Sequence, residues 1–108
     1  MSKLKLILPV LSIGLLLAAS AATAATCTPT GFFRDSLNMT AAAINPPGTF
    51  SGPLDATGCN IGIFYGAGAT GTVNSADIYG ANYFGVVVDG DSGVVSVDVS
   101  NSSIHDIG

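Results

Sequence analysis

The sequence predicts an all-β protein whose chain winds through repeated turns, a β-solenoid. The first observation is an internal repeat: Gly48-Thr49-Phe50 and Gly62-Ile63-Phe64-Tyr65 are matched 23 positions later by Gly71-Thr72-Val73 and Gly85-Val86-Val87-Val88. Self-similarity at a fixed period of about 20–50 residues is typical of solenoids and related arrays. The second observation is that the hydrophobic runs in this part are short and separated by Gly, Ser, Asn and Asp, as in short strands joined by corners.

Residues 1–25 have the pattern of an export signal. Two lysines open an apolar run over residues 4–17, and Ala22 and Ala24 stand at the small-residue positions of an A-x-A-like cleavage site. The run is shorter than the roughly 20 residues that span a bilayer. We therefore predict cleavage after Ala24 or Ala25, a secreted, periplasmic or cell-surface location, and no membrane attachment after cleavage.

The chain that follows this segment is strongly acidic. Residues 26–108 hold one Arg, seven Asp and one His, with no Lys and no Glu, which gives a formal charge of minus six. Nucleic acids and anionic membranes are bound mainly through basic side chains that neutralise phosphate groups. The composition therefore disfavours both as partners.

Cys27 and Cys59 are the only cysteines. Disulfides persist in the compartments that exported proteins reach, so these two residues are predicted to form one bond. A metal pair is the alternative, but two thiols with a single distant His make a poor zinc site.

Residues 26–47 differ from the repeats and are predicted to be an N-terminal capping segment. They contain Phe32 and Phe33 and a short helix predicted around Ser36–Ile44. Pro46-Pro47-Gly48 then forces a turn, because proline cannot continue a helix.

Residues 48–108 are predicted to form the repeated strands and corners. Val95-Ser96-Val97-Asp98-Val99 alternates strictly, which sends the three valines to one face of a half-buried strand. Corners are predicted at Gly66-Ala67-Gly68, Asp89–Gly93 and Asn101-Ser102-Ser103, where the residues tolerate tight or left-handed backbone. A period near 23 holds about three strands and three corners, with successive turns pairing in parallel.

The same region resembles a known family. Val97-Asp98-Val99-Ser100-Asn101-Ser102-Ser103-Ile104 looks like a repeat of the pectate-lyase-like superfamily, and Thr72-Val73-Asn74-Ser75-Ala76-Asp77-Ile78 has the same elements 26 positions earlier. The longer offset suggests a three-residue insertion in the Asp89–Gly93 corner. The resemblance implies a right-handed parallel β-helix of about two and a half coils over residues 48–108, and an incomplete one, since we expect the natural chain to continue.

Asn74 and Asn101 both lie at the turn that follows the valine strand in the two copies, 27 positions apart. The resemblance implies that their amides stack as a ladder between coils. Ordinary turn asparagines are the alternative, because Asn is common at corners for local reasons.

Asp89 and Asp91 are the residues that could hold a metal ion. Two carboxylates separated by a flexible glycine can converge on calcium, whose ligands are oxygens. Asp-Gly steps are also common turn signals, so a plain corner is the alternative. No other cofactor is predicted.

Two further pairs of adjacent residues have the chemistry for catalysis or for surface pairing. Neighbours on a strand point to opposite faces, so His105 and Asp106 are not expected to face each other. Arg34 and Asp35 are interpreted as a surface pair. Family lyases use a Lys or Arg base, and the repeats contain neither, so no catalytic residue is assigned.

Three functions from different classes follow. The first is a structural or binding protein that presents a polar face to polysaccharide or cell-surface glycan, without an active site. The second is the N-terminal fragment of a polysaccharide lyase or hydrolase. The third is a self-assembling surface or adhesin-type protein that associates through its open C-terminal coil. The lack of basic residues favours the first.

Overall fold

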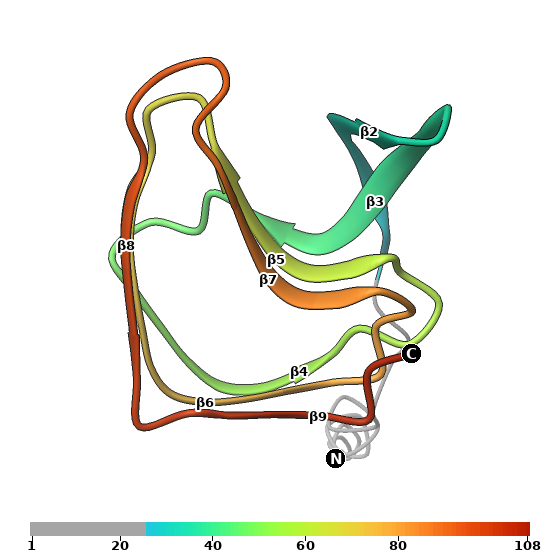
Figure 1. Ribbon diagram of the computed structural model, residues 1–108. Coiled ribbons are helices and arrows are strands. Elements are labelled where there is room, and N and C mark those ends of the chain that lie inside the picture. The colour runs from blue at the N-terminus through green and yellow to red at the C-terminus, as the bar shows by residue number, and fades with distance from the viewer. Residues whose placement is uncertain (1–25) are drawn as a thin grey trace, which may run out of the picture.

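All regular structure in the described part of the chain, residues 26–108 of a computed structural model, is β-strand. The predicted export signal lies outside these residues. In chain order the strands are β2 (Thr28–Arg34), β3 (Leu37–Ile44), β4 (Thr49–Asp55), β5 (Ile61–Gly66), β6 (Thr70–Tyr79), β7 (Phe84–Asp89), β8 (Ser96–Ser100) and β9 (Ser103–His105). They form two sheets (Figure 1). The first has the order β2-β3-β5-β7, and the second has the order β4-β6-β8, with β9 also paired to β6.

The internal repeat becomes parallel strand pairing. Phe50, Val73 and Val99 lie side by side on β4, β6 and β8. On the first sheet Ile63 of β5 lies beside Val86 of β7. Residues one repeat apart therefore occupy neighbouring strands, and apolar side chains at equivalent repeat positions pack against each other.

The predicted right-handed parallel β-helix is nevertheless wrong. The strands belong to two sheets instead of one parallel solenoid, and the first sheet is mixed, because β2 runs antiparallel to β3. The reversal occurs at Asp35 and Ser36, which both have positive φ (50° and 71°). Two consecutive residues with positive φ match the twist of a tight hairpin, so the chain turns back on itself there.

The helix predicted around Ser36–Ile44 is also wrong, since Leu37–Ile44 is strand β3. Met39 and Ala41 are fully buried, and the residues between and beside them are less so. This alternation has the period of two that is characteristic of a strand. Pairing with both β2 and β5 satisfies its backbone and outweighs the local helix propensity of the alanines.

Strand β5 is the centre of the core. All six of its residues are buried, as expected of a parallel strand covered on both faces. Ile63 and Tyr65 pack in one cluster with the buried residues of β6, whereas Ile61 and Phe64 pack in another with Met39. The glycines that recur at the repeat positions have a packing role, because a Cβ on Gly62 would lie 2.5 Å from the carbonyl oxygen of Gly85.

Candidate functional site

The predicted disulfide is confirmed. Cys27 and Cys59 are bonded, with their Cα atoms 5.3 Å apart and a sequence separation of 32. Cys59 is fully buried in a small cluster with Ala56 and Ala81. The bond ties the start of the described chain to the turn that precedes β5.

Asn74 and Asn101 lie in contact. The Nδ2 of Asn101 donates a hydrogen bond to the Oδ1 of Asn74 at 3.2 Å. Asn101 has positive φ (50°), a conformation that asparagine adopts more readily than most residues. The pair therefore has both the corner backbone of a turn asparagine and the side-chain contact that a ladder requires.

Asp89 and Asp91 lie at a corner after β7. The backbone N–H of Asp91 donates to Oδ1 of Asp89 at 3.0 Å, so one carboxylate oxygen is engaged in a local turn. Within residues 26–108 no three His, Cys, Asp or Glu side chains are arranged to hold a metal ion. Calcium binding by this pair remains a prediction from sequence.

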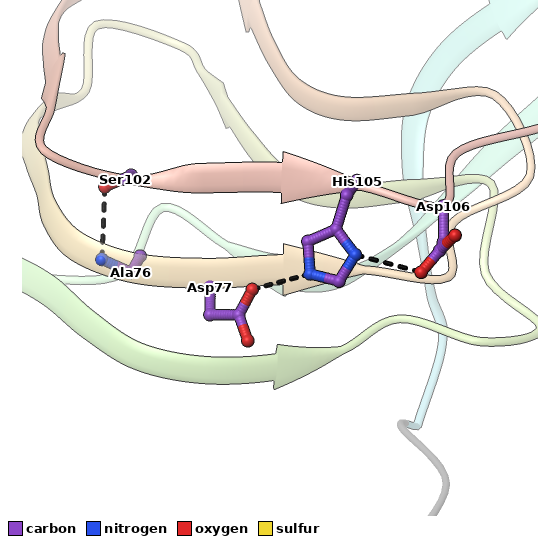
Figure 2. A network of polar contacts seen from close by, with 5 residues as sticks. All are labelled: Ala76, Asp77, Ser102, His105 and Asp106. Carbon is purple, nitrogen blue, oxygen red and sulfur yellow. Dashed lines mark hydrogen bonds and ion pairs between the residues drawn. The ribbon is translucent and has the colours of Figure 1, made fainter.

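His105 and Asp106 do face each other, contrary to the expectation from strand alternation. The Nδ1 of His105 lies 2.9 Å from Oδ2 of Asp106 (Figure 2). Strand β9 ends at His105, and Asp106 has positive φ (54°). A residue with positive φ interrupts the alternation of side chains along a strand, so the Asp106 carboxylate lies on the same side as the His105 imidazole.

Asp77 completes this cluster and was missed from sequence. Its Oδ1 lies 2.7 Å from Nε2 of His105 (Figure 2). The signal was present in the 26-residue offset, which pairs His105 with Tyr79 and so places Asp77, two positions earlier on the same face, beside the imidazole. The Tyr79 ring stacks on the imidazole, with centroids 5.5 Å apart and planes 20° apart.

The two carboxylates determine what this histidine can do. The hydrogen bond to Asp106 and then that to Asp77 raise the pKa of His105 above its usual 6.5. Both ring nitrogens are engaged, so no free nitrogen is left to accept a proton from a substrate. The geometry suits a charged, structural imidazolium better than a general base.

A cleft lies beside the β2–β3 hairpin of the first sheet. We call it the hairpin cleft. It has a volume of about 260 Å³ and is lined by Arg34, Asp35, Leu37, Met39 and Tyr83. Buried Met39 closes it, and Tyr83 is 48% exposed at its edge. It is small for a ligand pocket, and its size suits one sugar ring or one side chain.

Arg34 is held over aromatic rings instead of pairing with Asp35. Its guanidinium carbon lies 5.8 Å from the Tyr83 ring centroid and 5.5 Å from that of Phe84, within the range of a cation–π contact. Among the described residues Arg34 makes no salt bridge, so the predicted surface pair with Asp35 is wrong. The guanidinium N–H groups are oriented by the rings and can donate hydrogen bonds to a ligand.

No family model, no curated protein and no solved structure matches this chain. The described residues contain no helix of the length and apolar character needed to cross a membrane.

Proposed function

We propose that this protein is exported and binds neutral polysaccharide, or the neutral glycan of a cell surface, at the hairpin cleft. The observation that carries the proposal is the combination of an exposed Tyr83 ring with the donors of Arg34 and the acceptors of Asp35 around one small hollow. Binding sites for small ligands pair an apolar wall with a few polar groups that fix orientation. A sugar ring has an apolar face for the tyrosine and hydroxyls for the charged groups.

Charge supports a neutral ligand. Residues 26–108 hold seven carboxylates against one guanidinium, so a polyanionic chain would be repelled from most of the surface. A neutral polymer meets no such barrier.

Export is supported by the disulfide and by the sequence of residues 1–25. A Cys27–Cys59 bond is stable in an oxidising compartment and rare in the cytosol. A binding role without catalysis is supported by His105, whose nitrogens both contact carboxylates.

Affinity electrophoresis in gels that contain neutral polysaccharides, such as xylan, mannan or a β-glucan, tests the proposal. We expect retardation in at least one gel, and Tyr83→Ala to weaken binding roughly 10- to 30-fold, as truncation of a central tyrosine does at many interfaces. Tyr83→Phe should keep most of the affinity, since it keeps the ring. Arg34→Gln should weaken binding through loss of the guanidinium donors.

Val94→Ala is the matched control, because Val94 is 88% exposed and lies outside the hairpin cleft. It should bind like the parent protein. If no neutral polysaccharide retards the parent, or if Tyr83→Ala is retarded as strongly as the parent, the proposal is wrong.

A further inference from the structure

Strand β9 is attached to the molecule by polar contacts. It has three residues, all exposed, and pairs with a single neighbour, β6. Just before it, the Oγ of Ser102 accepts a hydrogen bond from the backbone N–H of Ala76 at 3.1 Å (Figure 2). Its apolar contacts are limited, since Ile104 packs over Gly85 but stays 44% exposed and Ile107 beyond the strand is only partly buried. Hydrogen bonds and ion pairs therefore contribute much of what holds this strand.

The residues after β9 continue the attachment. The carbonyl oxygen of Asp106 accepts from the N–H of Gly80 at 3.2 Å, and the N–H of Gly108 donates to the carbonyl oxygen of Ala81 at 3.0 Å. Asp106 thus carries two attachments, one through its backbone and one through its carboxylate to His105. Movement of the imidazole would therefore disturb both the backbone and the side-chain attachment of Asp106.

The protonation state of His105 decides how many of its contacts are favourable. An imidazolium donates from both nitrogens, whereas a neutral imidazole donates from one and presents a lone pair at the other. With Asp77 at one nitrogen and Asp106 at the other, only the charged form makes two hydrogen bonds. The neutral form sets a lone pair against a carboxylate oxygen.

We propose that His105 is a pH-dependent clasp: as an imidazolium it holds β9 and the following residues against β6, and loss of its proton releases them.

The surroundings of the imidazole contain carboxylates and no described cation. Asp77 and Tyr79 face it from β6, and Asp106 faces it from the residue after β9. Asp55 of β4 lies beside Tyr79 on the neighbouring strand, on the side away from His105. Its carboxylate accepts hydrogen bonds from Thr57. Of these groups Asp106 and Asp77 raise the pKa of His105, whereas burial of the ring lowers it.

The direction of the pH dependence follows from linkage. The pKa of His105 is higher in the docked state, so the clasp is fully effective below about 6.5, the pKa of a free histidine, and weakens as pH rises through the raised pKa. For every unit by which the docked pKa exceeds the released one, the open fraction rises about tenfold across this range. The groups are exposed, so added salt should reduce the effect.

Nuclear magnetic resonance of the protein tests the proposal, because His105 is the only histidine in the sequence and its ring signals need no assignment by mutation. We expect the ring to titrate above 6.5. Hydrogen exchange of the Gly80 and Gly108 amides, corrected for the intrinsic effect of pH, should accelerate through the same midpoint. Amides of β5 provide the internal reference and should not change.

Two variants separate a switch from a merely structural contact. His105→Gln can still form hydrogen bonds but does not titrate. In this variant the exchange rates of the Gly80 and Gly108 amides, corrected for the intrinsic effect of pH and measured at the same temperature as the parent, should be independent of pH between about 5 and 9. Asp77→Asn should lower the midpoint of His105. Asp98→Asn is the matched control, since Asp98 is an exposed aspartate on β8 with no side-chain hydrogen bond among the described residues.

Three results would overturn the clasp. They are a His105 midpoint at or below 6.5, exchange of Gly80 and Gly108 that does not follow that midpoint, and a pH dependence that survives in His105→Gln.

Discussion

Strands β5 and β9 are both paired in parallel with neighbours, yet they are held in opposite ways. Every residue of β5 is buried, and every residue of β9 is exposed. Around β5 even the hydroxyl of Tyr65 has no hydrogen-bond partner among the described residues, and burial raises the pKa of that phenol. Around β9 the side-chain contacts are mostly polar, made by an imidazole, two carboxylates and a serine hydroxyl, and its one aliphatic residue, Ile104, is 44% exposed.

The difference teaches that strand pairing alone does not set local stability in this protein. Burial of apolar surface and a covalent bond hold the region around β5, and these respond weakly to pH and salt. Hydrogen bonds and ion pairs in contact with water hold β9, and each of these contributes little and is sensitive to conditions. The region of β9 should therefore open first.

Loss of the disulfide has the largest expected effect on this contrast. The double variant Cys27→Ser, Cys59→Ser should lower the free energy of unfolding by about 3–4 kcal/mol, the value expected for a loop of this size on the chain-entropy model. Chemical denaturation measures it. The parent protein under reducing conditions is the control and should behave like the variant.

If the disulfide variant kept the full stability of the parent, the region around β5 would depend on packing alone. That result would mean that the disulfide does not contribute to the difference in stability between the β5 and β9 regions.

Gly62→Ala has the next largest expected effect. Its new Cβ would lie 2.5 Å from the carbonyl oxygen of Gly85 and 2.6 Å from Cγ2 of Ile78, and backbone cannot move away cheaply between paired strands. We expect a loss of about 1–3 kcal/mol in unfolding free energy, as for other overpacked cores. Gly90→Ala is the matched control, because its Cβ would meet only ordinary contact at 3.6 Å.

Equal stabilities of Gly62→Ala and Gly90→Ala would show that the two strands can separate easily at this point. The close approach of β5 and β7 would then not be a source of stability.

The smallest expected effect concerns the Asn74–Asn101 contact, which belongs to the polar region. A double-mutant cycle of Asn74→Ala and Asn101→Gly, with glycine chosen to keep the positive φ at 101, should give a coupling of about 0.5–1 kcal/mol. Thermal or chemical unfolding of the four proteins measures it. A coupling of zero would leave two independent turn asparagines and remove the ladder.

The sequence predicted the pairing of the repeats better than the shape of the fold. The 23-residue offset places Phe50 beside Val73, and the 26-residue offset places Val73 beside Val99, as the structure has them. Similar residues stack at these positions because neighbouring parallel strands bury the same side chains. The hairpin was missed, because Asp35 and Ser36 give a weaker turn signal than Asn-Gly and the alanines of β3 are compatible with a helix.

The candidate site residues also differ in how far the sequence predicted them. The disulfide was predicted because two cysteines in a chain that is predicted to be exported have one simple pairing. The Asp77–His105 contact was encoded in the 26-residue offset but depended on knowing which strands pair. The hairpin cleft was not predicted, because Arg34 and Tyr83 are 49 positions apart and no local pattern connects them.

The sequence by itself determined the strand-rich composition, the register of the repeats, the acidity and the disulfide, since each depends on residue type and spacing along the chain. Only the tertiary structure decided the antiparallel start of the first sheet, the hairpin cleft and the position of Asp106 beside His105. The physical reason is that these depend on backbone reversals at a few positive-φ residues, Asp35, Ser36 and Asp106. Such residues carry only a weak signature in sequence, yet each redirects everything that follows it.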